Sequence, residues 1–397
     1  MAASRASAIH EEFRVDRVRI FLAAIPLEVP FTISGGTLAV RKSLIVELAG
    51  DGISGFGESA PFEAPFYSAE TTDSALAMLT RWLAPRVVGR SFRDIAHLNE
   101  VLGEGIRGNH FARAGIETAV WDLLARRNGI SLHELIRHQL GQLGVPAEYR
   151  ESRPYFESGV ALGIPPGQDL ALLRAWAEQS LKEGYHRVKI KVKPGWDTVP
   201  TRAVREVIGA HFPFWVDANA AYRLEEHYPA LKALDGYGLL FVEQPLHHDD
   251  LLDHAELARR LTTPICIDES LKDARVGRQA LAVGAASVWN IKIQRVGGLY
   301  EACRLYKLGV ENGVRIWGGT MPESGIGGAA MMALASFEGF AEPADIEPSA
   351  RWYGPGRDLL EMEMDRQGRI RVPTDPGLGL PISEENFRHY CELVYEQ

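Results

Sequence analysis

Short apolar runs, each closing on a charged or polar residue, recur from about Phe156 onward. They read FESGVALGI, RVKIKV, FWVDAN, LLFVEQP, PICIDES, SVWNIKI, RIWGGT and AEPADI. Segments with helical periodicity, such as LALLRAWAEQSLKEG and DHAELARRL, lie between them. Steps of 26, 26, 25 and 24 residues separate five run-end positions, Lys191, Asp217, Glu243, Asp268 and Lys292. Strands that alternate with helices at this period predict a parallel sheet, and eight such strands close a barrel.

The first ~150 residues have a different pattern. RVDRVRIFLAAIPL and KSLIVELAG alternate like antiparallel strands, and the turn-forming pair Asp51-Gly52 predicts a hairpin with ISGFGESAP. FARAGIETAVWDLLARRNG predicts a helix that ends at Gly129. After Ile346 the barrel pattern stops, and RDLLEMEMDRQGRIRVP predicts a hairpin around Gln367-Gly368 that packs back on the first domain.

We therefore predict an α/β protein, a (β/α)₇β TIM-like barrel with an N-terminal α+β capping domain. The capping domain spans 13–150 and is completed by the C-terminal segment 350–397. The barrel with the active site spans 151–349, and residues 1–12 form a disordered tail.

Composition narrows the class of protein. The net charge of −9, without a basic patch, argues against a nucleic-acid partner. No apolar run reaches transmembrane length, so we expect no membrane partner. Three widely spaced cysteines (Cys266, Cys303 and Cys391) favour a reducing compartment, so we expect a cytoplasmic protein.

Asp217, Glu243 and Asp268 end three consecutive predicted strands. In a barrel, residues at the C-terminal ends of strands meet at one rim. Three carboxylates that converge there repel each other unless a divalent cation binds them, and oxygen-only ligands favour Mg²⁺, or Mn²⁺, over zinc. The triad therefore predicts a metal site.

Lys189, Lys191 and Lys292 are the candidate catalytic cations. Lys189 and Lys191 lie two apart in one predicted strand and point inward, and Lys292 ends the strand on the opposite side of the ring. Two bases would thus address opposite faces of one carbon. A proton next to a carboxylate is weakly acidic, but a cation stabilises the enediolate that forms when it leaves. A lysine is a base only when neutral, and we expect desolvation and the neighbouring cation to lower its pKa.

The ordered series KIK, VDAN, FVEQPL, IDES and NIKIQRVGG resembles the muconate-lactonizing subgroup of the enolase superfamily. The resemblance covers nearly the whole chain. It implies a capping domain over a (β/α)₇β barrel and a Mg²⁺ ion on the three carboxylates. It also implies that Lys191 and Lys292 are catalytic, that Lys189 assists electrostatically and that Asn219 borders the site. We therefore expect a small-molecule carboxylate as the substrate, and we expect the enzyme to be a homo-oligomer.

Within the subgroup, EAPFYSAETT, WDLLARRNGISLHEL, GTMPESGIGG and ADIEPSARWY resemble the o-succinylbenzoate synthase / N-succinylamino acid racemase family. Arg295 matches an arginine typical of its racemase-capable members. The chain departs from the family pattern at Ala161, Gly328 and Glu347, and an acid at Glu347 resembles the acidic pair by which dipeptide epimerases hold an ammonium group. The candidate substrate-binding residues are Asn219, Arg295, Gly319, Met321, Glu323, Glu347, Phe66 and Tyr67.

Three reactions share this machinery. The preferred prediction is racemisation or epimerisation of an N-acylated amino-acid derivative, in which Lys191 and Lys292 alternate as acid and base. The alternatives are o-succinylbenzoate synthesis for menaquinone, a syn dehydration started by Lys191, and dipeptide epimerisation. A non-catalytic barrel would have lost at least one of the five strand-end positions, and none is lost. The pair His247-His248 follows Pro245 in a predicted loop, where we expect solvent exposure.

Overall fold

The computed structural model describes residues 9–397. Most of the predicted tail, residues 1–8, lies outside this range. Of its remaining four residues, His10 donates its backbone N–H to Asn128 (2.8 Å), and the Glu11 carboxylate lies 2.6 Å from the His138 ring.

Seven parallel strands form the central sheet, and each neighbours the next in chain order. They are β7 (Val160–Leu162), β8 (Val188–Lys191), β9 (Phe214–Asp217), β10 (Val242–Glu243), β11 (Ile265–Ile267), β12 (Val288–Ile291) and β13 (Arg315–Gly318). The predicted eighth strand, AEPADI, is not a regular strand, and Pro343 in it has no N–H to donate. Its backbone nevertheless closes the ring: Asp345 N–H donates to Gly318 O (2.9 Å), and Gly159 N–H donates to Ala344 O (2.8 Å). The predicted (β/α)₇β barrel with its capping domain is confirmed.

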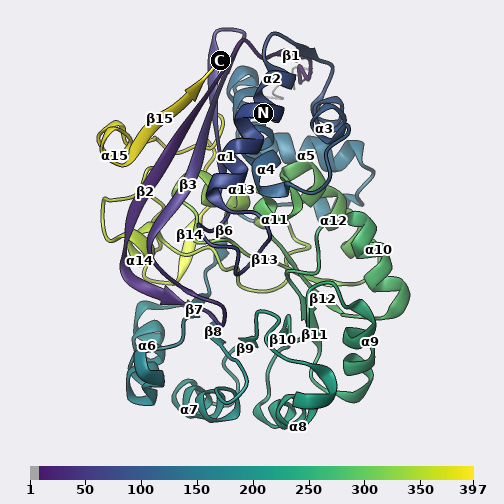
Figure 1. Cartoon of the computed structure of the whole chain (residues 1–397), viewed down its shortest axis with the longest axis vertical. Coiled ribbons are helices and arrows are strands. Elements are labelled where there is room, and N and C mark those ends of the chain that lie inside the picture. The colour runs from purple at the N-terminus through teal and green to yellow at the C-terminus, as the bar shows by residue number, and fades with distance from the viewer. Residues whose placement is uncertain (1–8) are drawn as a thin grey trace, which may run out of the picture.

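Helices surround these strands, and the first four of these helices lie in the lower half of Figure 1. They are α6 (Leu170–Glu183), α7 (Thr198–Ile208), α8 (Leu224–Leu234), α9 (Leu251–Arg260), α10 (Ala274–Val283), α11 (Ile293–Val296), α12 (Leu299–Glu311) and α13 (Gly325–Ala335). Because helices cover the outside and side chains fill the inside, β8, β9 and β12 are buried at every position. A lysine or a carboxylate at the end of such a strand needs a partner.

The capping domain is built on a four-stranded antiparallel sheet in the order β15-β2-β3-β4. Its strands are β2 (Arg17–Thr32), β3 (Thr37–Gly50), β4 (Ile53–Ser59) and β15 (Cys391–Glu396). Asp51 and Gly52, with φ of 53° and 77°, form the predicted two-residue turn between β3 and β4. The C-terminal strand β15 pairs with β2, so the end of the chain lies on this sheet (Figure 1).

Further helices, short strands and single turns complete the fold. The helices are α1 (Thr72–Met78), α2 (Ala84–Val87), α3 (Ile95–Gly103), α4 (His110–Asn128), α5 (Leu132–Gln142), α14 (Ser349–Tyr353) and α15 (Glu384–Tyr390). The strands are β1 (Phe13–Arg14), β5 (Ser91–Phe92), β6 (Tyr155–Glu157) and β14 (Arg369–Arg371), and the single turns are η1 (Leu79–Leu83), η2 (Ala147–Arg150), η3 (Pro166–Gln168) and η4 (Asp235–Tyr237). The tight turn at 365–369 leads into β14, which pairs with β6.

Two buried carboxylates connect the capping domain to the barrel. Glu117 in α4 accepts the backbone N–H groups of Leu299 (2.7 Å) and Tyr300 (2.8 Å) at the start of α12. Glu58 in β4 accepts from the hydroxyl of Ser324 (2.6 Å) and the N–H of Gly327 (3.0 Å) at the start of α13. Acids at helix N-termini satisfy unpaired donors and meet the positive end of the helix dipole. These contacts hold the loop after β4 over the mouth of the barrel.

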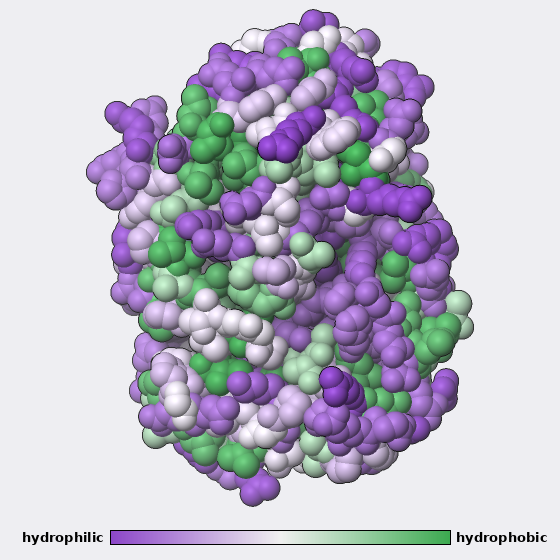
Figure 2. All heavy atoms as spheres, in the orientation of Figure 1, coloured by the Kyte–Doolittle hydropathy of each residue, from purple (hydrophilic) through white to green (hydrophobic). Residues whose placement is uncertain are grey.

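The molecular surface mixes hydrophilic residues with smaller hydrophobic groups on the face shown in Figure 2. Within residues 9–397, none of the helices combines the length and the apolar character that crossing a bilayer requires.

Candidate active site

Three carboxylates meet at the C-terminal ends of neighbouring barrel strands. Asp217 ends β9, Glu243 ends β10, and Asp268 directly follows β11. All three are fully buried, and each offers an oxygen that lies within 4.8 Å of the others. Burial and the nearby Asp217 raise the pKa of Glu243 to about 7. A divalent cation would relieve this repulsion, and three carboxylates are hard oxygen donors that fit Mg²⁺ or Mn²⁺.

Fixed donors orient two of these acids. Trp215 Nε1 and Asn290 Nδ2 each donate to one oxygen of Glu243, both at 3.0 Å. Asp268 accepts from Arg295 and from the hydroxyl of Tyr67 (3.2 Å). The Glu243 and Asp268 carboxylates are thus held in place before any ligand binds, and Asn290 and Trp215 were not singled out from the sequence.

Two lysines lie at opposite ends of the acid cluster. Lys191 at the end of β8 places Nζ 2.6 Å from Asp217 Oδ2, and Lys292, directly after β12, places Nζ 2.8 Å from Asp268 Oδ2. The three acid-bearing strands β9, β10 and β11 lie between them in the sheet. The two ammonium groups therefore flank the cluster from different strands.

Lys189 has a different environment. Its ammonium group pairs with Asp345 and lies 3.4 Å from Glu243 and 3.7 Å from Asp217. Burial alone would lower the pKa of Lys189, but these carboxylates outweigh it and raise the pKa above its usual value. The same balance, dominated by Asp268, raises the pKa of Lys292. For these two groups the protein surroundings thus raise the pKa rather than lower it, because acids surround them more closely than cations do.

Asp345 is a site residue that sequence reasoning missed. It pairs with both Lys189 and Arg187, and Arg187 lies 2.5 Å from its carboxylate while stacking 4.0 Å above the Trp215 ring. Asp345 is the first residue of the motif DIE, from which only Glu347 was predicted to be a site residue.

A pocket of about 430 Å³ opens above the cluster, between the barrel and the capping domain. Its lining residues are Phe31, Ile33, Phe62, Tyr67, Ala161, Lys189, Lys191, Asn219, Lys292, Thr320, Met321, Pro322, Asp345, Glu347 and Trp352. All three candidate lysines line it, together with four of the eight candidate substrate-binding residues.

The other four candidates lie near the pocket but not in its lining. A side-chain carbon at Gly319 would lie 2.8 Å from Lys292 Cε, so only glycine leaves that lysine its present position. Arg295 is buried against Asp268 and lines a second cavity. Phe66 stacks on Phe62 with ring centroids 4.9 Å apart, and Glu323 is buried near Glu58.

Asn219 follows β9 by two residues and has a left-handed backbone conformation, with φ of 43°. Its side-chain amide donates to Glu269 Oε1 (3.0 Å), and its backbone N–H donates to Asp217 Oδ1 (3.0 Å). Glu269, which sequence reasoning also missed, is buried, and that burial together with Asp268 raises its pKa to about 8.

The departures from the family pattern fall in different places. Glu347 lines the pocket, where Oε1 accepts the N–H of Ala161 (2.9 Å) and Oε2 lies 3.4 Å from Arg351 Nε. Burial, only partly offset by Arg351, raises the pKa of Glu347 to about 7. Gly328 lies inside α13 and faces Met362, away from the pocket.

Two family models match the chain. Residues 16–137 match the N-terminal domain of mandelate racemase / muconate lactonizing enzyme, and residues 172–386 match the enolase C-terminal domain-like family. Together they span both domains of the fold.

Relatives and a solved structure agree with this match. The chain is 40% identical over 370 residues to an o-succinylbenzoate synthase of Geobacillus kaustophilus, covering 93% of each chain. It is 38% identical over 372 residues to an N-succinylamino acid racemase of Amycolatopsis sp, covering 94% of this chain and 96% of the relative.

A crystal structure of an enolase-superfamily member from Listeria innocua superposes with a TM-score of 0.86 at 32% identity, covering 97% of this chain and 98% of that one. The resemblance predicted from the strand-end motifs is confirmed. The chain belongs to the enolase superfamily, in the mandelate racemase / muconate lactonizing group, and is an enzyme of the isomerase or lyase type.

Proposed function

We propose that this protein is a Mg²⁺-dependent racemase or epimerase of an N-acylated amino-acid derivative, acting by abstraction of the proton next to the carboxylate. The observation that carries the proposal is the position of Lys191 and Lys292. They flank the acid cluster from strands on either side of it and line the same pocket.

In this proposal each lysine works on one face of the substrate's α-carbon. One lysine, in its neutral form, accepts the α-proton, and the other, as an ammonium, donates a proton to the opposite face, which inverts the configuration. The reverse reaction exchanges the two roles. Lys189 remains protonated among its three carboxylates and supplies positive charge for the enediolate that forms.

Asp217, Glu243 and Asp268 would hold the Mg²⁺ ion. The chemistry that this ion supplies when bound is positive charge beside the substrate carboxylate, which lowers the cost of removing the α-proton. The ion would also share the negative charge that raises the pKa values of Lys189 and Lys292.

The choice of substrate class rests on Glu347 and Ala161. A substrate with a distal carboxylate needs a hydrogen-bond donor at its far end. Here the N–H of Ala161 is already taken by Glu347, and Glu347 itself would repel an anion. An ammonium or a neutral amide suits this end of the pocket better. This favours an amino-acid derivative over the dehydration that gives o-succinylbenzoate, although a relative with that name is 40% identical.

Steady-state kinetics test the proposal on three substrate classes: N-succinyl amino acids, dipeptides, and the precursor of o-succinylbenzoate. We expect amino-acid derivatives with a cationic or neutral far end, such as dipeptides, to be turned over best. N-succinyl amino acids, whose distal carboxylate would face Glu347, should be turned over less well. Glu347→Gln should reduce kcat/KM for dipeptides, whose far end is an ammonium group. It should leave kcat/KM nearly unchanged for N-acetyl amino acids, whose far end is uncharged. The proposal fails if kcat/KM for the dehydration is ~10⁴ M⁻¹s⁻¹ or above and no amino-acid derivative has a comparable kcat/KM.

A further inference from the structure

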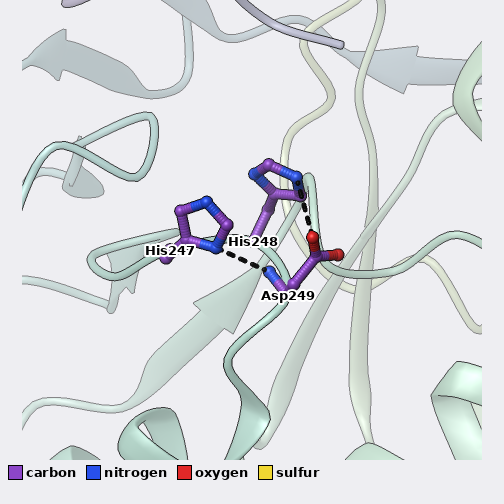
Figure 3. Close-up of side chains that lie close together, drawn as sticks. All are labelled: His247, His248 and Asp249. Atoms are coloured by element: carbon purple, nitrogen blue, oxygen red, sulfur yellow. Dashed lines mark hydrogen bonds and ion pairs between the residues drawn. The ribbon is translucent and has the colours of Figure 1, made fainter. Parts of the chain in front are cut away.

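The loop between β10 and α9 brings together two imidazoles and a carboxylate that the proposed reaction does not use. His247, His248 and Asp249 are consecutive, and each offers a ligand atom within 4.8 Å of the others (Figure 3). His247 and Asp249 are exposed and His248 is half-buried, so the cluster is open to solvent.

The two rings have few competing partners. They stack with ring centroids 4.3 Å apart. Among residues 9–397, Asp249 alone is joined to either ring by a hydrogen bond or ion pair. Its N–H donates to His247 Nδ1 at 3.3 Å, and its Oδ2 lies 3.4 Å from His248 Nε2. Both contacts are longer than an ordinary hydrogen bond, so breaking them costs a bound ligand little free energy.

The loop itself is held in shape. Asp250 N–H donates to His247 O (3.0 Å), and the Asp250 side chain caps α9 by accepting the N–H of Asp253 (2.9 Å). The other oxygen of Asp249 pairs with Lys272. A loop whose backbone is already held by such contacts loses less conformational entropy on binding a ligand than a free loop would.

We propose that His247, His248 and Asp249 form a second metal site, which takes a transition-metal cation such as Zn²⁺ and completes its coordination with water. Two imidazoles and one carboxylate are ligands that suit zinc, whereas Mg²⁺ prefers oxygen ligands alone. The site is distinct from the buried acid cluster, because the two groups share no residue.

The position of this site relates it to the pocket. His248 lines a cavity of about 690 Å³ together with Tyr67 and Arg295, and both of these residues contact Asp268. A cation on the loop would therefore lie at the rim of a cavity that borders the acid cluster without occupying the cluster itself.

Substitution of Lys272 should change the Zn²⁺ affinity in the opposite direction from substitution of the histidines. Its ammonium group competes with a cation for Asp249. Lys272→Ala should therefore tighten Zn²⁺ binding, whereas removal of either imidazole should weaken it.

The experiment is equilibrium dialysis of the full chain against Zn²⁺ with excess Mg²⁺ present, at one pH. The variants are H247A, H248A, the double variant and K272A, with His211→Ala as control because His211 is an exposed histidine outside the loop. Circular dichroism checks that each variant is folded. Any Zn²⁺ held by the acid cluster is common to all of them, so the difference between variants isolates the loop.

We expect each single histidine variant to weaken the loop site at least about ten-fold, as for loss of groups that support a metal ligand. The double variant should lose one equivalent of Zn²⁺, K272A should bind more tightly, and H211A should match the wild type. An unchanged stoichiometry and affinity in the double variant would overturn the proposal, as would a loss of equal size in H211A.

Discussion

The carboxylate of Glu243 shows how single residues determine this site. It ends a buried strand, so its side chain points to the barrel axis, and both its oxygens accept hydrogen bonds from neutral donors, Trp215 and Asn290. Neutral donors hold the carboxylate without cancelling its charge, which remains available to a cation.

The first prediction concerns this acid cluster. Asp217→Asn or Glu243→Gln should abolish activity and weaken Mg²⁺ binding, because each change removes a negative ligand from a site of three. Calorimetric titration with Mg²⁺, activity assays and thermal unfolding measure the three effects, and the fold should persist. Full activity of EDTA-treated enzyme without added metal would contradict the prediction.

The second prediction concerns the paired lysines. Lys191→Ala and Lys292→Ala should each lose at least ~10³ in rate, about 4 kcal/mol of barrier. Each variant should still exchange the α-proton of one enantiomer with deuterium from solvent, and the enantiomer should differ between the two variants. NMR follows this exchange.

Lys193→Ala is the matched control for these variants, since Lys193 follows the same strand but does not line the pocket. Loss of exchange for both enantiomers in either lysine variant would argue against two separate bases.

At the residue scale, regular spacing made the strand-end acids and lysines predictable. Residues whose role depends on tertiary closure were not predictable in this way. Asp345 pairs with Lys189 only because the eighth segment closes the ring, and Tyr67 reaches Asp268 only because the capping loop folds over the mouth. The sequence drew attention to the motif DIE and to Tyr67, but neither local pattern specified the partner that each residue contacts.

At the scale of elements, the alternation of strand and helix was predictable because parallel strands are almost wholly apolar and end in loops of similar length. The Asp51-Gly52 turn was predictable because a two-residue hairpin requires positive φ at both positions. The eighth segment was predicted as a strand, but with Pro343 it pairs only through isolated bridges.

The third prediction concerns the contact between the end of α8 and the residues that precede β11. Asp235 accepts the backbone N–H groups of Thr262 (3.1 Å) and Thr263 (2.9 Å) and pairs with Lys232 at 2.7 Å. Partial burial works against ionisation, but these donors outweigh it and lower the pKa of Asp235 to about 2. The folded state therefore binds the proton of this carboxyl more weakly than the unfolded state does.

This stabilisation is complete above the unfolded pKa of ~4 and disappears as the pH falls towards about 2. Asp235→Asn should lower the free energy of unfolding at pH 7 by on the order of 1 kcal/mol, after allowance for solvent screening. The difference from the wild type should shrink as the pH falls below 4. Urea unfolding across this pH range measures it, and a difference that grows towards low pH would contradict the prediction.

The two domains form the pocket together, because each of them contributes residues to its lining. Phe31, Phe62 and Tyr67 come from the capping domain, while the lysines come from the barrel. The sequence predicted that the capping domain precedes the barrel, but it could not predict how the two meet. The contact between Glu58 and Ser324 joins residues 266 positions apart, and no local pattern encodes such a pair.

The last prediction concerns this joint. Glu58 Oε2 accepts from both Ser324 and Gly327 at the start of α13. Glu58 is the next-to-last residue of β4, the strand that leads into the loop with Phe62 and Tyr67. In Glu58→Gln the amide nitrogen cannot accept, so at least one buried donor is left without a partner. We expect a loss of roughly 2–3 kcal/mol in the free energy of unfolding, the range for hydrogen bonds to charged groups.

A loosened joint should also reduce kcat/KM, since the capping wall of the pocket would be less fixed over the lysines. Glu63→Gln is the control, because Glu63 lies in the same loop but is exposed and, among residues 9–397, pairs only with Lys42. Denaturant unfolding and steady-state kinetics measure the two effects. If Glu58→Gln unfolds at the same denaturant concentration as Glu63→Gln, the joint is held by apolar packing between the domains, and Glu58 contributes little to it.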